Sequence, residues 1–246
     1  MNLAGAGYGD IFDLRGNAYA QAMVRWPAAR DAEFAALFDE VSVLDGQRVL
    51  DVPAGGAYLR ARLPQAQVTE LEFSEGFSAG VPVVQPLGDW AVHLAGAGAG
   101  PFDHVVCLAA LHHIQEGDAF VRRLLTLLGP GGVLHMADVP LGSKVAGFLD
   151  GFVGRYNQTG HNGLYRAADP QAWARLGRVL RCEERVVPWR FATDNDMLAF
   201  TAGLFGVRDC PMPELMHALE TQVGVVRSAE GVSLQWRLWY VDLAAA

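Results

Sequence analysis

Two acidic residues, Asp51 and Glu72, each end an apolar run that is typical of a buried strand. After Asp51 the chain turns through small residues, including Gly55, into a helical pattern. Backbone N–H groups at such a helix start are free to bind a ligand, and glycine lets that ligand approach the backbone closely. A carboxylate at a strand end can accept hydrogen bonds from sugar hydroxyls. The pattern therefore predicts a site for a ribose-bearing cofactor.

Strands alternate with helices around this turn, which predicts an α/β fold: a doubly wound, mostly parallel sheet with helices on both faces. The strands of this part are expected at residues 48–52, 67–73, 81–85, 104–108 and 133–139. Helices are expected at residues 17–43 (with a break at Pro27), 58–63, 74–79 and 118–128. We expect the glycine-rich residues 1–10 to be mobile.

The second half of the chain has a looser pattern. Helices are expected at residues 144–156, 169–180, 195–204 and 213–223. Strands are expected at residues 181–188 and 232–243. Without an internal repeat or a linker, residues 1–246 are expected to form a single domain. Its parts are a helical cap (1–45), a cofactor-binding core (46–140), helices with a sixth strand and substrate-cap insertions (141–225), and a last strand (226–246).

Composition excludes several classes of partner. The 246 residues are 51% hydrophobic and carry a formal charge of −8, which favours a globular domain and disfavours binding to nucleic acid or anionic lipid. Three widely spaced cysteines predict neither a disulfide framework nor a metal site. Because no signal-peptide pattern and no apolar run of membrane-spanning length is evident, we expect a cytoplasmic protein without a membrane span.

Four segments in series carry a resemblance to a known family. They are VLDVPAGGAYL (49–59), VTELEFSEGF (68–77), PFDHVVCLAALHHI (101–114) and LGPGGVLHMADV (128–139). In this order and spacing, the chain from about residue 45 to 140 resembles the class I S-adenosylmethionine-dependent methyltransferases, most closely small-molecule enzymes of the ubiquinone/menaquinone-biosynthesis type. The resemblance implies a Rossmann-like seven-stranded sheet whose last strand, here residues 232–243, runs antiparallel.

The resemblance also assigns roles in binding S-adenosylmethionine and its product S-adenosylhomocysteine. Asp51 would order the turn, Gly55 would admit the methionine part, and Glu72 would accept hydrogen bonds from both ribose hydroxyls. Asp89 would hold the adenine amino group. The other expected cofactor contacts are Pro53, Ala54, Phe73, Trp90 and Leu108, together with Tyr19 and Arg25 on the N-terminal helices.

Two of the turn residues depart from the family pattern. Pro53 and Ala57 stand where the family usually has glycine. A methyl group at Ala57 narrows the turn, and it would strain the backbone if this position requires a positive φ.

Histidines follow the fourth expected strand, close to where the methyl group would lie. His112 is a candidate general base, and a turn histidine that only hydrogen-bonds the backbone is the alternative. His161, in a loop, is the second catalytic candidate, with a solvated loop histidine as its alternative. The residues expected to contact substrate are His113, Asp138 and Tyr165.

These observations predict methyl transfer to oxygen or nitrogen of a small, partly apolar metabolite. One alternative is a non-catalytic binding protein that keeps the fold with a weakened cofactor site. A less favoured alternative is an NAD-dependent oxidoreductase, since Glu72 could hold an NAD ribose, although the turn lacks G-x-G-x-x-G. The expected partner is a small molecule, with a homodimer as a possible assembly.

Overall fold

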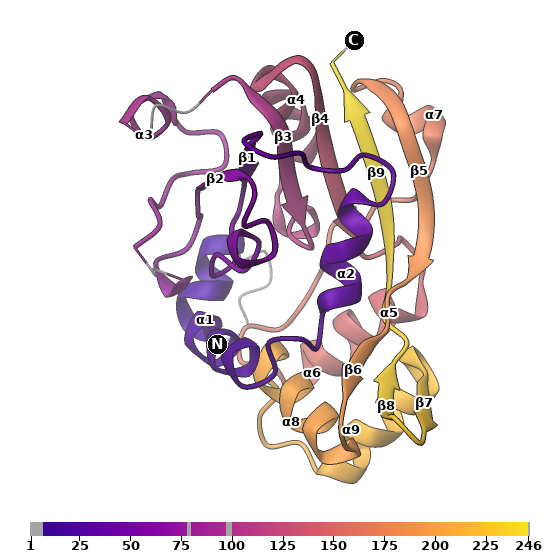
Figure 1. Ribbon diagram of the computed structural model, residues 1–246. Helices are drawn as coiled ribbons and strands as arrows, with labels where there is room; N and C mark the ends of the chain where they lie inside the picture. Colours follow the sequence, from indigo (N-terminus) through magenta and orange to yellow (C-terminus); the bar gives the residue numbers. More distant parts are fainter. Residues whose placement is uncertain (1–6, 78–79, 97–99, 246) are drawn as a thin grey trace.

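The computed structural model describes residues 7–77, 80–96 and 100–245, and a six-stranded sheet forms its centre (Figure 1). The strand order is β2-β1-β3-β4-β9-β5. Strands β1 to β4 are parallel, whereas β9 is antiparallel to both of its neighbours, β4 and β5. The strand bounds are Arg48–Asp51 (β1), Gln67–Glu70 (β2), Phe102–Leu108 (β3), Leu128–Asp138 (β4), Arg178–Val186 (β5) and Arg237–Ala244 (β9). The prediction of a mostly parallel sheet with an antiparallel last strand is confirmed.

A seventh strand is not confirmed. The segment expected as a strand at residues 81–85 contributes one isolated parallel bridge, Glu72 to Val83. Two backbone hydrogen bonds flank this bridge, from the Glu72 N–H to Pro82 and from the Val84 N–H to Glu72. Pro82 and Pro86 lack the N–H groups that a longer ladder would use, which explains why the pairing stops there.

The chain changes sheets within its expected last strand. Residues 232–243 divide between β9 and β8 (Gly231–Leu234), which pairs with β6 (Trp189–Phe191) and β7 (Val225–Ser228) in a separate antiparallel sheet. In Figure 1 this small sheet lies beyond the start of β9, beside α8 (Asp194–Phe205) and α9 (Met212–Ala218).

The first helix, α1 (Tyr8–Arg25), begins earlier than the sequence pattern predicts. Of residues 1–10, which were expected to be mobile, 1–6 lie outside the described residues and Tyr8 to Asp10 form the first helical turn. Helix α1 packs against α8 and against the short 3₁₀ turn η3 (Glu75–Phe77). Of the helix expected at residues 74–79, the described residues form only this turn, and residues 78–79 are not described.

The remaining helices are short. They are α2 (Asp31–Ala35), α3 (Ala91–Gly96), α4 (Gly117–Thr126), α5 (Lys144–Gly147), α6 (Gly154–Tyr156) and α7 (Pro170–Trp173), with further single turns at Ala36–Phe38 (η1), Arg60–Arg62 (η2) and Leu111–His113 (η4) and π-helical segments at Phe148–Val153 (η5) and Leu219–Val223 (η6). The expected helix at 169–180 is wrong beyond Trp173, because β5 already begins at Arg178. Within the described part of the chain, no helix combines the length and apolarity needed to cross a membrane.

Candidate active site

A cavity opens at the carboxyl ends of β1 and β3, where ligands gather in parallel sheets. The turn after β1 forms one wall, α1 covers it, and the histidine turn η4 closes the far side. Its volume is about 90 Å³, below the roughly 300–1,000 Å³ of most small-molecule sites. The described conformation is therefore a closed one.

The turn after β1 requires unusual backbone angles. Gly55 and Gly56 have φ values of 56° and 102°, and Ala57 has a φ of 63°. For Ala57 this left-handed conformation costs roughly 1–2 kcal/mol, because its Cβ crowds the following carbonyl oxygen. The sequence predicts backbone strain at Ala57 if this position has a positive φ, and the structure has one.

Glu72 lies behind the glycine turn and is 1% exposed. Its carboxylate accepts hydrogen bonds from the backbone N–H groups of Gly55 (2.6 Å) and Phe73 (2.7 Å). Burial raises the pKa of Glu72 to about 7, and the backbone donors oppose that shift. The acid and the glycine turn, whose Gly55 lies seventeen residues before Glu72 in the sequence, are thus in direct contact.

Aromatic residues of α1 fill the space beside Glu72. The Tyr8 ring lies edge-on to Phe73 with centroids 5.8 Å apart, and the Phe12 ring lies 5.8 Å from that of His113. Burial, and then the charge of Glu72, raise the pKa of Tyr8, which keeps its hydroxyl neutral. Neither residue has a local sequence signal for a site, since only the docking of α1 places them there.

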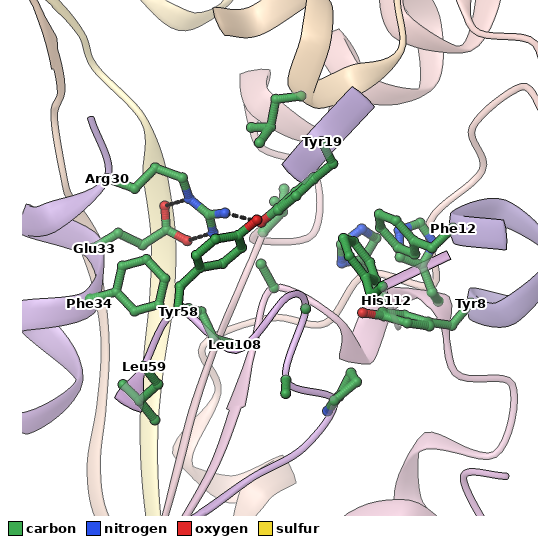
Figure 2. A pocket seen from close by; sticks show the side chains of 18 of the residues that line it. Tyr8, Phe12, Tyr19, Arg30, Glu33, Phe34, Tyr58, Leu59, Leu108 and His112 are labelled. Atoms are coloured by element: carbon green, nitrogen blue, oxygen red, sulfur yellow. Dashed lines mark hydrogen bonds and ion pairs between the residues drawn. The ribbon is translucent and has the colours of Figure 1, made fainter. Parts of the chain in front are cut away.

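The opposite end of the cavity holds a buried ion pair between Arg30 and Glu33 (Figure 2). Arg30 also donates to the Tyr19 hydroxyl, and the Trp189 indole N–H donates to Glu33 at 2.8 Å. Tyr58 faces Tyr19 with ring centroids 6.2 Å apart. Figure 2 shows this group well separated from Tyr8, Phe12 and His112, so the cavity has two chemically different ends.

A histidine–aspartate pair forms where β3 and β4 end. His112 Nδ1 lies 2.6 Å from Asp138 Oδ1, and the His112 backbone N–H donates to Asp138 Oδ2 at 2.9 Å. The carboxylate therefore fixes both the ring and the backbone of His112. With Nδ1 held in this way, Nε2 is the nitrogen left to exchange a proton.

A second pair of the same kind faces the first. His161 Nδ1 lies 2.7 Å from Asp150 Oδ1, which also accepts from the Tyr165 hydroxyl at 2.8 Å. A backbone hydrogen bond from Leu164 to His112 (2.8 Å) ties this loop to η4. The His161 side chain is 2% exposed, so its loop does not leave it solvated.

His113 completes a three-histidine cluster with His112 and His161. One nitrogen from each ring lies within 4.8 Å of the others, a set that could hold a metal ion. The sequence spacing predicted no metal site, since residues 112 and 161 meet only through the fold. Burial, followed by the charges of His112 and His161, lowers the pKa of His113 well below its ordinary range. This histidine is neutral.

Comparison with known proteins identifies the core. Residues 50–136 match the family model described as "Methyltransferase domain". A ubiquinone biosynthesis O-methyltransferase of Xanthomonas axonopodis pv. citri is 35% identical over 106 residues, which are 37% of this chain and 43% of that protein. The matched region is the one that carries β1 to β4 and the glycine turn.

Residues 50–136 of this chain are a methyltransferase domain.

Solved structures agree on this fold. A putative methyltransferase of Bacillus halodurans superposes with a TM-score of 0.52 at 17% identity, covering 86% of this chain and 97% of that one. A phosphoethanolamine N-methyltransferase of Haemonchus contortus, in complex with phosphomonomethylethanolamine and S-adenosylhomocysteine, superposes with a TM-score of 0.54 at 14% identity. It covers 98% of this chain and 61% of that one. The chain spans less than half the length of the curated relatives it matches first.

The methyltransferase fold brings most of the expected site residues together. Those that line the cavity are Tyr19, Asp51, Pro53, Ala54, Gly55, Leu108, His112, His113 and His161. Glu72, Phe73, Asp138 and Tyr165 lie directly behind them, each in contact with a lining residue.

Three expected cofactor contacts lie elsewhere. Arg25 is exposed and its guanidinium lies over the Trp26 ring, so the arginines that line the cavity are Arg15 and Arg30. Asp89 accepts a hydrogen bond from the Ala91 N–H at the start of α3, and Trp90 is 1% exposed.

Trp90 is part of the hydrophobic core. Its ring packs against Phe73 and Phe120, and its indole N–H donates to the Gln85 carbonyl oxygen. In this conformation it lies behind Phe73 and away from the cavity, because burying the indole in the core removes more apolar surface from water.

Proposed function

We propose that this chain transfers the methyl group of S-adenosylmethionine to an oxygen or nitrogen atom of a small, partly apolar acceptor, and that oxygen is favoured. The observation that carries the proposal is the Asp138–His112 pair at the end of the sheet that also bears the glycine turn. Two findings support it: the family of the core, and the O-methyltransferase activity named for the Xanthomonas relative.

The residues around Glu72 fit this cofactor. The Gly55 N–H can donate a hydrogen bond to the methionine carboxylate of the cofactor, and the Glu72 carboxylate can accept hydrogen bonds from the ribose hydroxyls. In the closed conformation the Gly55 N–H and the Glu72 carboxylate bind each other, so each would exchange this partner for the cofactor. The bound cofactor supplies an electrophilic methyl group.

Orientation is the main contribution of the protein to such a reaction. Holding the acceptor atom in line behind the methyl carbon can supply roughly 7–11 kcal/mol. His112 Nε2 would accept the proton of an acceptor hydroxyl, and Asp138 would stabilise the imidazolium that forms. A positioned base of this kind contributes about 10²–10⁴-fold.

Two experiments test the proposal. Calorimetric titration of the purified chain with S-adenosylhomocysteine should show saturable one-site binding, and a lack of binding at millimolar ligand would favour a non-catalytic binding protein. A metabolite extract incubated with the chain and labelled methyl donor should then yield a labelled small molecule that is absent from a boiled control.

A further inference from the structure

Arg15 is a buried cation for which the described residues supply no partner. Its side chain is 8% exposed, its Nε and Nη1 atoms have no hydrogen-bond partner, and no ion pair is found for it in the described part of the chain. Arg30, the other arginine of the cavity wall, is paired with Glu33. Burial lowers the pKa of Arg15 to about 10, which still leaves it charged at neutral pH. Buried charges are normally paired, so Arg15 lacks an anion.

The surroundings of Arg15 direct it toward the histidine end of the cavity. Its guanidinium lies 4.7 Å from the centre of the Phe12 ring, and its stem passes Gly206 at the end of α8. It lines the same cavity as His113 and His161, and the charge of Arg15 lowers the pKa of both histidines.

The two acids of the histidine cluster already have other hydrogen-bond partners. Asp138 binds His112 through its ring and its backbone, and also accepts from the Val139 N–H. Asp150 accepts from His161, Tyr165 and the Gly163 N–H. Neither carboxylate contacts Arg15, and the three-histidine cluster beside it contains only neutral or basic groups.

We propose that Arg15 binds a carboxylate of the methyl acceptor, so that the acceptor is an apolar or aromatic hydroxy acid. This rests on the proposed function. The planar guanidinium fork matches a carboxylate with two parallel hydrogen bonds. The His112 and His161 Nε2 atoms, with Nδ1 held by aspartates, accept the proton of a hydroxyl, and Phe12, Phe205 and Trp236 supply apolar wall.

Two other ligands for this end of the cavity are less well supported. A metal ion on the three histidines would lie beside the uncompensated charge of Arg15, which repels it. The cofactor carboxylate on Arg15 would leave an acidic acceptor without a cation, because Arg30, the other arginine of the cavity wall, already binds Glu33 and Tyr19 at the opposite end (Figure 2). The test distinguishes all three.

The first measurement uses the metabolite extract and labelled methyl donor, with the full chain. The labelled product of the wild type should be retained on an anion-exchange resin at pH 7, since its carboxylate stays free. Arg15→Gln should lower labelling at limiting extract at least tenfold, and Arg25→Gln, an exposed arginine of the same helix, should not. A neutral product overturns the inference but leaves methyl transfer intact, whereas no labelled product at all overturns both.

The second measurement compares ligands of the cofactor side. Arg15→Gln should bind S-adenosylhomocysteine and 5′-methylthioadenosine, which lacks the carboxylate, with wild-type affinities. Selective loss of S-adenosylhomocysteine affinity would assign Arg15 to the cofactor. One equivalent of zinc in the purified wild type, lost in His161→Ala, would assign the cluster to a cation instead.

A third readout separates ligand binding from a structural role. Removing an unpaired buried charge should raise the melting temperature of the ligand-free protein, so Arg15→Gln should melt above the wild type. A fall in melting temperature together with unchanged labelling would show that Arg15 is structural.

Discussion

The Glu72 carboxylate accepts a hydrogen bond of 2.6 Å from the Gly55 backbone N–H, so the acid that follows β2 is fastened to the turn that follows β1. In the proposed site, each group would bind a different part of the cofactor. Their mutual bond therefore keeps a cofactor site satisfied while it is closed, because a buried donor or acceptor left unpaired would cost about 1–3 kcal/mol.

Glu72 should make cofactor binding depend on pH. Its pKa of about 7 in the closed protein, against an ordinary 4.5, means that it is largely protonated just below neutral pH. Ribose hydroxyls favour the ionised form, so binding S-adenosylhomocysteine should release protons and tighten as the pH rises through 7. Calorimetry at pH 6.5 in buffers of different ionisation enthalpy measures this release.

A pair of glutamine variants checks the assignment. Glu72→Gln should abolish the proton release and weaken S-adenosylhomocysteine binding at least tenfold. Glu72→Ala should weaken binding similarly and also lower the melting temperature, because it leaves the Gly55 N–H without its acceptor. Glu75→Gln, an exposed neighbour, should behave as the wild type. Unchanged affinity in Glu72→Gln would remove Glu72 from the site.

Ala57→Gly should stabilise the protein. The substitution removes the roughly 1–2 kcal/mol that the left-handed conformation costs alanine in the folded state. Glycine also raises the entropy of the unfolded chain, which lowers the free energy of unfolding by about 0.4–1 kcal/mol. Urea denaturation should show a net gain of roughly 0.5–1 kcal/mol. Ala61→Gly, a few residues on in η2, should lose stability, and an equal loss in both variants would contradict the strain at Ala57.

His112→Ala should slow turnover without changing cofactor affinity. The base supplies about 10²–10⁴-fold, so the rate of labelled methyl transfer should fall by at least two orders of magnitude. The exposed His217→Ala serves as the control. A wild-type rate in His112→Ala would return His112 to the alternative of a turn histidine that only supports the backbone.

Arg30→Met should destabilise the fold strongly. It leaves the fully buried Glu33 carboxylate without its cation, and breaking one side of a buried pair costs about 3–5 kcal/mol. Arg155→Met removes an exposed ion pair with Glu214, worth about 0–1 kcal/mol. Chemical denaturation of both variants compares the two costs, and similar small losses would show that Glu33 is neutral in the folded protein.

The sequence carries the parts of the site that follow from strand ends. Asp51, Glu72, His112 and Asp138 each end or follow a strand, and parallel strands bring such residues to one edge of the sheet. Local spacing was sufficient in these cases, because backbone direction alone decides where the side chains lie. At Ala57 the sequence raised a positive φ only as a condition, and the structure has it.

Other parts of the site depend on packing between distant segments. Tyr8 and Arg15 reach the cavity only through the docking of α1, and Asp150 in η5 meets His161 only through the folding of the loop after α6. No local pattern encodes either contact. Trp90 shows the reverse case, since its position after the expected third strand fits an adenine contact, yet its large apolar surface is buried in the core.

The covering of Glu72 by Tyr8 has a kinetic consequence. If the closed form predominates in solution, cofactor can enter only during the fraction of time in which the start of α1 is displaced, and the apparent dissociation constant rises by the inverse of that fraction. Association measured by rapid mixing would then level off at high cofactor concentration, at the rate with which this helix departs. Displacement of the first turn of α1 would then set the highest rate at which cofactor can enter the site.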